Sequence, residues 1–159
     1  MKKSSEKTNV MRILDQKKAV YQSYDYTHAV TTNGEEVAKV LGQDPNRVFK
    51  TLVTQGASKQ YYVFLVPVCR ELHLKKAAAA VGEKSISMLP QKDLLPLTGY
   101  VHGGCSPIGM KKAFCSTIDA TAQQFDTIVF SAGKIGYQVE LSLDELQKAL
   151  TFTLKDITE

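Results

Sequence analysis

One stretch of the sequence, TGYVHGGCSPIGMKK at residues 98–112, concentrates residue types that could do chemistry. Cys105 and Ser106 are potential nucleophiles, and His102 stands shortly before them. A serine or cysteine hydrolase needs a histidine base within hydrogen-bond reach, and close neighbours in sequence rarely achieve that geometry. The stretch also lacks a G-x-S-x-G nucleophile elbow. A small, partly buried Cys105 thiol is therefore favoured over a nucleophile.

The same stretch does not match the usual metal or phosphate signatures. Zinc sites show closely spaced ligand pairs, and a second pair beside His102 and Cys105 is missing, so no metal is expected. The glycines do not form a Walker A loop, and no cofactor is expected. Gly103 and Gly104 could still present backbone N–H groups to an anion or oxyanion. A purely structural turn is the alternative, and the residues alone leave both open.

Lys50 is unusual because it lies inside an apolar-rich segment, RVFKTLV. An alternating strand can point such a lysine into solvent, which is its common place. If that face of the strand lines a pocket, the same ammonium group becomes a fixed cation that holds a phosphate or polarises a carbonyl. The sequence alone does not decide between the two.

The surrounding pattern predicts the elements that must position these residues. Two helices are expected to begin with capping boxes, one from Thr32–Glu35 to Gly42 and one from Ser142–Glu145 through Leu150. A helix is also expected from Thr8, and another over 72–82 with Leu74 and Ala77 facing inward. A single helical turn is expected at 91–97. Strands are expected over 20–26, 47–56, 60–68 and 84–89, and as a pair within 126–141. Helices and strands do not alternate regularly, which favours an α+β fold with a mixed sheet.

Composition places the chain among ordinary globular proteins. Of the 159 residues, 43% are hydrophobic and 23% are charged. A chain of this length is expected to form a single domain over 1–159, with residues 1–7 frayed. No apolar run suits a membrane span or a secretory signal, and three cysteines fit a reducing compartment, so a cytoplasmic location is expected. The net charge of +4 permits nucleic-acid binding without requiring it.

Several motifs in order along the chain resemble one known family. They are YDYTH, LGQDPNRVFKTLV, LHLKKAAAAVG, TGYVHGGCSPIGMKK and VFSAGKIGYQVEL, which together cover nearly everything after about residue 20. The chain resembles the YbaK/EbsC family of aminoacyl-tRNA deacylases, and within it the branch that hydrolyses Cys-tRNA(Pro). The resemblance implies a barrel-like mixed sheet core flanked by helices, and homology to the editing domain inserted in many bacterial prolyl-tRNA synthetases.

The resemblance also implies a site and a mechanism. Lys50, Gly103 and Gly104 are implied as catalytic residues. Implied substrate-binding residues are Tyr26, Thr51, Ser106, Pro107, Ser131 and Gly133. The implied substrate is an ester between an amino acid and the terminal ribose of mischarged tRNA(Pro), attacked by the substrate's own cysteine thiol. Prolyl-tRNA synthetase is an implied partner, whereas no membrane, DNA, metal or cofactor is expected.

The sequence departs from the family pattern at three positions. Relatives usually carry an aliphatic residue at the place of Cys105, Ala132 replaces a common glycine, and some relatives have an acidic residue where this chain has Gln138. The alternatives are a sister deacylase acting on Ala-, Ser- or Thr-tRNA, and a noncatalytic adaptor that binds tRNA or a synthetase. The presence of Lys50 and the complete glycine loop disfavours the adaptor.

Overall fold

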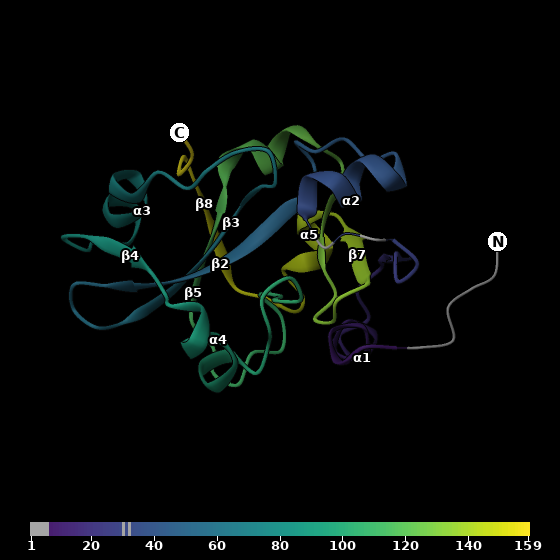
Figure 1. Cartoon of the computed structure of the whole chain (residues 1–159), viewed down its shortest axis with the longest axis horizontal. Coiled ribbons are helices and arrows are strands. Elements are labelled where there is room, and N and C mark those ends of the chain that lie inside the picture. The colour runs from purple at the N-terminus through teal and green to yellow at the C-terminus, as the bar shows by residue number, and fades with distance from the viewer. Residues whose placement is uncertain (1–6, 30, 32) are drawn as a thin grey trace.

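The computed structural model describes residues 7–29, 31 and 33–159, and its described strands form two sheets (Figure 1). The larger sheet has the order β4-β2-β3-β5-β8, with bounds Ile86–Met88, Phe49–Gly56, Tyr61–Pro67, Cys115–Asp119 and Phe152–Lys155. The smaller sheet has the order β1-β7-β6, with bounds Gln22–Asp25, Tyr137–Leu141 and Ile128–Ser131. The described helices are α1 (Asn9–Gln16), α2 (Gly34–Leu41), α3 (Leu74–Val81), α4 (Gln91–Thr98), the 3₁₀ helix η1 (Ala120–Gln124) and α5 (Leu143–Leu146).

The larger sheet is mixed, as the sequence predicts. Strands β2 and β3 form an antiparallel hairpin, while β3–β5 and β5–β8 pair in parallel. A parallel bridge between Val48 and Val129 connects the two sheets just before β2 and within β6. The α+β class with helices around the sheets is confirmed, and the described residues form two bridged sheets in place of one barrel-like sheet.

Strand β3 is the centre of the larger sheet and is buried on both faces. Because successive side chains of a strand point to opposite faces, Val63 and Leu65 join one apolar cluster while Phe64 and Val66 join another. The first cluster includes α1 and the smaller sheet, and the second includes Ala77 of α3. The continuous apolar run of this segment therefore reflects a strand covered on both sides.

Side-chain caps explain where the helices begin. Thr8 Oγ1 accepts a hydrogen bond from the Met11 N–H, which confirms the predicted start of α1, and Ser142 Oγ accepts from the Glu145 N–H at the start of α5. Thr32 lies outside the described residues, and the cap of α2 is Asn33, whose Oδ1 accepts from the N–H groups of Glu35 and Glu36. The predicted Thr32–Glu35 capping box is therefore wrong by one residue.

Other predicted boundaries also need correction. Leu74 is expected to face inward but is 43% exposed, because it is the first residue of α3 and the face that packs is formed by Ala77 and Ala78. Helix α5 ends at Leu146, well before Leu150. The segment expected as one turn at 91–97 is a full eight-residue helix, α4. Of the residues expected to be frayed, 1–6 lie outside the description, and Lys7 forms an ion pair with Asp15.

Residues 156–159 fasten the turn between β3 and α3. The Glu159 N–H donates to the Glu71 carbonyl at 3.1 Å, and the His73 N–H donates to the Ile157 carbonyl at 2.8 Å. Leu72 and Thr158 form an antiparallel bridge between these two hydrogen bonds. Ile157 is fully buried, and its N–H donates to Asp119 Oδ1 at 3.0 Å. The backbone around Glu71 is thereby held against the larger sheet.

The described helices are all short. None of them is long and apolar enough to cross a membrane.

Candidate active site

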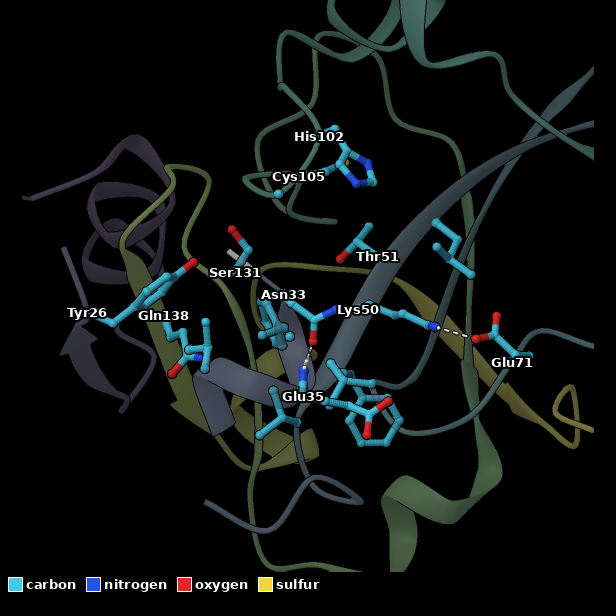
Figure 2. A pocket seen from close by; sticks show the side chains of 18 of the residues that line it. Tyr26, Asn33, Glu35, Lys50, Thr51, Glu71, His102, Cys105, Ser131 and Gln138 are labelled. Atoms are coloured by element: carbon cyan, nitrogen blue, oxygen red, sulfur yellow. Dashed lines mark hydrogen bonds and ion pairs between the residues drawn. The ribbon is translucent and has the colours of Figure 1, made fainter. Parts of the chain in front are cut away.

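A cavity of about 350 Å³ opens where the two sheets meet (Figure 2). Its walls come from the start of β2, the beginning of α2, the adjoining ends of β6 and β7, and the loop that contains Gly103. Five predicted site residues line it, namely Tyr26, Lys50, Thr51, Gly103 and Ser131. Segments far apart in sequence therefore bring the predicted lysine, tyrosine and glycine loop to one place.

Lys50 lies on the cavity wall with its side chain 29% exposed. Its Nζ is 3.5 Å from Glu71 Oε1, and the Glu71 side chain is 79% exposed (Figure 2). An ion pair with so exposed a partner contributes little free energy, because water screens the charges and the side chains lose conformational freedom. An anionic ligand can therefore displace Glu71 from Lys50. Of the two positions that the sequence allows for Lys50, in solvent or in a pocket wall, the structure shows the pocket wall.

Thr51 offers a hydrogen-bonding group that the fold does not use. Its Oγ1 is buried and has no hydrogen-bond partner among the described residues. A buried hydroxyl without a partner costs free energy, which a bound ligand recovers by pairing with it. Both Lys50 and Thr51 line the cavity, although successive side chains of β2 point to opposite faces of the strand.

The two loop glycines have different surroundings. Gly103 lines the cavity and has φ +89°, a conformation that glycine adopts without strain. The Gly104 N–H donates to the Val101 carbonyl at 3.0 Å, so it closes a turn and is not free for an oxyanion. A Cβ on Gly104 would lie 3.0 Å from the Ile135 backbone nitrogen. The structure thus brings Gly103 to the cavity and gives Gly104 a packing position.

Ser106, Pro107 and Gly133 do not line the cavity. Ser106 is fully buried, and its Oγ accepts from the Ile108 N–H at 3.4 Å. Gly133 has φ +88°, and a Cβ there would lie 2.9 Å from Val10 Cγ2. These residues shape the loops that contain Gly103 and Ser131.

Replacing Gly103 by valine is expected to reduce turnover at least about tenfold, because a branched side chain would occupy the cavity wall and strain the backbone. The matched control is Gly82→Val. Gly82 has φ +74°, and a Cβ added there would meet nothing within 4 Å, so it tests the same backbone strain away from the cavity. Melting temperatures and initial rates of both variants check this. A folded Gly103→Val protein with the rate of the Gly82→Val protein would contradict a role for this loop.

The described residues bring one sulfur to the cavity, and its environment keeps it protonated. Cys105 is 8% exposed, and burial raises the pKa of its thiol to about 12. The thiolate is the nucleophilic form of cysteine, and it is scarce for this residue at neutral pH. His102 also lines the cavity, and no hydrogen bond joins it to Cys105 among the described residues. The structure thus agrees with the sequence-based prediction that Cys105 is a buried thiol and not a nucleophile.

A Cys105→Ala protein is therefore expected to retain at least about half of the native rate, since only a small packing contact is lost. Initial rates at matched folded concentrations measure this. A folded but inactive Cys105→Ala protein, or a trapped acyl-enzyme on Cys105, would contradict this assignment.

The cavity also has lining residues that sequence reasoning does not select, including Asn33, Glu35, Glu71 and Gln138. Gln138 stands out in the sequence only as a departure from the family pattern. No sequence pattern around Glu71 predicts that it lines the cavity, because its position depends on a turn held by backbone hydrogen bonds from residues 156–159. Among the described residues, no three His, Cys, Asp or Glu side chains are close enough to hold a metal ion.

Comparisons with known proteins show the family of the chain. Residues 27–149 match the sequence model of the aminoacyl-tRNA editing domain. Enterococcus faecalis EbsC, provisionally named a Cys-tRNA(Pro)/Cys-tRNA(Cys) deacylase, is 43% identical over 158 residues, which are 99% of this chain and 96% of that protein. A proline–tRNA ligase of Thermosipho melanesiensis is 36% identical over 76 residues, which are 48% of this chain but 13% of the ligase.

A solved structure supports the fold. It is described provisionally as a trans-editing enzyme for prolyl-tRNA synthetase, and it superposes with a TM-score of 0.80 at 21% identity, covering 97% of this chain and 99% of the other. The sequence matches define an enzyme of the aminoacyl-tRNA deacylase class, a hydrolase that acts on ester bonds. The chain belongs to the aminoacyl-tRNA editing domain family.

Proposed function

We propose that this protein acts in trans to remove cysteine from mischarged tRNA(Pro). The observation that carries the proposal is a cavity lined by a cation, Lys50, and by Thr51, whose hydroxyl is unpaired. Among the described residues that line this cavity, the one with a sulfur atom is Cys105, and its thiol is protonated. Such a cavity can position and polarise an ester but offers no activated nucleophile of its own. The name of its relative EbsC, which specifies cysteinyl-tRNA, supports the choice of amino acid.

The attacking group in this mechanism belongs to the substrate. The cysteinyl thiol loses its proton, and the sulfur attacks the carbonyl carbon of its own ester. The bond from that carbon to the ribose oxygen breaks, the oxygen takes up a proton, and a cyclic thiolactone leaves the intact tRNA and later hydrolyses. Gly103 allows close approach of the backbone to the carbonyl, and Lys50 holds the terminal adenosine end of the tRNA.

Editing of this kind has a physical motive. Cysteine is close to proline in size, and a pocket that binds an amino acid by shape discriminates weakly between similar volumes. A second site that reads the thiol restores accuracy. The match to a proline–tRNA ligase supports prolyl-tRNA synthetase as the partner that hands over the tRNA, and the cytoplasmic location stays a prediction.

The test is release of labelled amino acid from a panel of mischarged tRNAs. We expect Cys-tRNA(Pro) to be deacylated, while Ala-tRNA(Pro) and the seryl and threonyl esters persist. Preferred release of alanine, serine or threonine would favour the sister deacylases. Binding of tRNA without release of any amino acid would favour the noncatalytic adaptor.

A further inference from the structure

Gln138 lines the cavity but takes no part in the proposed attack by the substrate thiol. This residue of β7 is 5% exposed and pairs in register with Ser131 of β6 and Tyr24 of β1. Figure 2 shows it on the same wall as Tyr26, across the cavity from Thr51 and Lys50. A buried polar side chain in this position needs hydrogen-bond partners, because burial removes those that water would supply.

One end of the Gln138 amide is fixed by a second glutamine. Gln43, which follows the end of α2, donates from its Nε2 to Gln138 Oε1 at 2.9 Å. The Gln43 Oε1 is itself buried without a partner among the described residues. The reverse orientation of the Gln43 amide would bury an unpaired nitrogen with two donors at that place, which is less favourable. Gln43 therefore acts as a donor that turns the Gln138 oxygen away from the ligand.

The other end of the amide remains available. Gln138 Nε2 has no hydrogen-bond partner among the described residues, and the side chain lines the cavity. The charged lining residues Glu35 and Glu71 are exposed, whereas the apolar lining residues Val37 and Phe130 are buried. The cavity thus has an ionic mouth and a neutral inner end, with the Gln138 N–H group as a donor in the neutral part.

We propose that Gln138 is the residue that selects the amino acid, by donating a hydrogen bond from Nε2 to the side-chain sulfur of the bound cysteinyl group. The inference rests on the proposed function, which places the tRNA end at Lys50 and so the amino acid at the inner end. A sulfur accepts this hydrogen bond, and more strongly as it becomes a thiolate. An alanyl group has no acceptor there and excludes water from the Gln138 N–H group, which leaves this donor unpaired in the complex and disfavours binding.

Binding of stable analogues tests this selection separately from hydrolysis. The probes are adenosine derivatives with cysteine or alanine joined to the 3′ position through an amide, titrated by calorimetry under reducing conditions. The native protein is expected to bind the cysteinyl analogue about tenfold more tightly than the alanyl analogue, the cost of one buried unpaired donor.

The decisive variant is Gln138→Glu, which keeps an oxygen to accept from Gln43 but replaces the donor by an acceptor. It should abolish the preference for the cysteinyl analogue. Gln91→Glu makes the same chemical change at an exposed residue outside the cavity and should keep the preference. Gln43→Met, which removes the fixing donor, should lower the preference while leaving affinity for the alanyl analogue unchanged.

The outcomes separate the two proposals. A folded Gln138→Glu protein that keeps the native preference, or a native protein without any preference, would overturn the inference. If Gln138→Glu does not fold, Gln138→Met serves in its place, with loss of preference expected. If the native protein prefers the cysteinyl analogue but releases no cysteine from tRNA, the proposed function fails while the selection by Gln138 stands.

Discussion

Cysteine is expected to leave Cys-tRNA(Pro) at least about a hundredfold faster than serine leaves Ser-tRNA(Pro), a difference of about 2.7 kcal/mol in activation free energy. The two aminoacyl groups differ by one atom, but a thiol ionises at a pKa of about 8.5 while an alcohol stays protonated throughout the accessible range. Cys105 cannot replace the missing substrate thiol for the seryl ester, since burial raises the pKa of its own thiol to about 12.

The pH dependence provides a second measurement. If the substrate thiolate attacks, the rate on the cysteinyl ester should rise with pH up to about the thiol pKa of 8.5 and then level off, after subtraction of spontaneous hydrolysis. A protein lacking Cys69, Cys105 and Cys115 should give the same profile. Equal rates on the cysteinyl and seryl esters would sink the substrate-assisted mechanism, whatever the shape of the profile.

Lys50→Ala is expected to lower deacylation of Cys-tRNA(Pro) at least about tenfold, because loss of a fixed cation near developing charge costs more than about 1.4 kcal/mol. The fold should survive, since the lysine side chain is 29% exposed and its ion pair with Glu71 is weak. Initial rates and melting temperature, measured on the same preparation, check both parts.

Two variants serve as controls for Lys50→Ala. Lys84→Ala removes an exposed lysine that does not line the cavity and should leave the rate unchanged. Glu71→Gln removes the partner charge of Lys50 and should leave the rate the same or raise it, because the ammonium group is then free for the substrate. Undiminished turnover by a folded Lys50→Ala protein would remove this lysine from the mechanism.

The sequence predicts the elements of this fold well where a local signal exists. The hairpin of β2 and β3 has alternating and apolar runs around a glycine turn, and α1 has an apolar face behind a capping threonine. Strands β5 and β8 have no comparable signal, because they are held by parallel pairing with β3 and with each other, contacts that residues distant in sequence make. Their pairing became visible only in the structure.

The site shows the same division between local and distant information. Lys50 and Gly103 stand out by residue type and context, and both line the cavity. The family motif does not distinguish Gly103 from Gly104, because the difference lies in which N–H closes a turn with Val101. Gln138 needs Gln43 to have a defined orientation, and that pair joins β7 to the end of α2 across the fold. No pattern within either segment reports it.

The fastening of the Glu71 turn by residues 156–159 has a consequence for biosynthesis. A ribosome makes β2, the cavity loop and β7 before it reaches Ile157, Thr158 and Glu159, whose backbone groups hold Glu71, Leu72 and His73. Until those residues emerge from the exit tunnel, the turn beside Lys50 and the Asp119 carboxylate at the end of β5 lack these partners. The turn that presents Glu71 to Lys50 is therefore among the last parts of the fold to be completed, and a chain terminated a few codons earlier would lack these backbone hydrogen bonds.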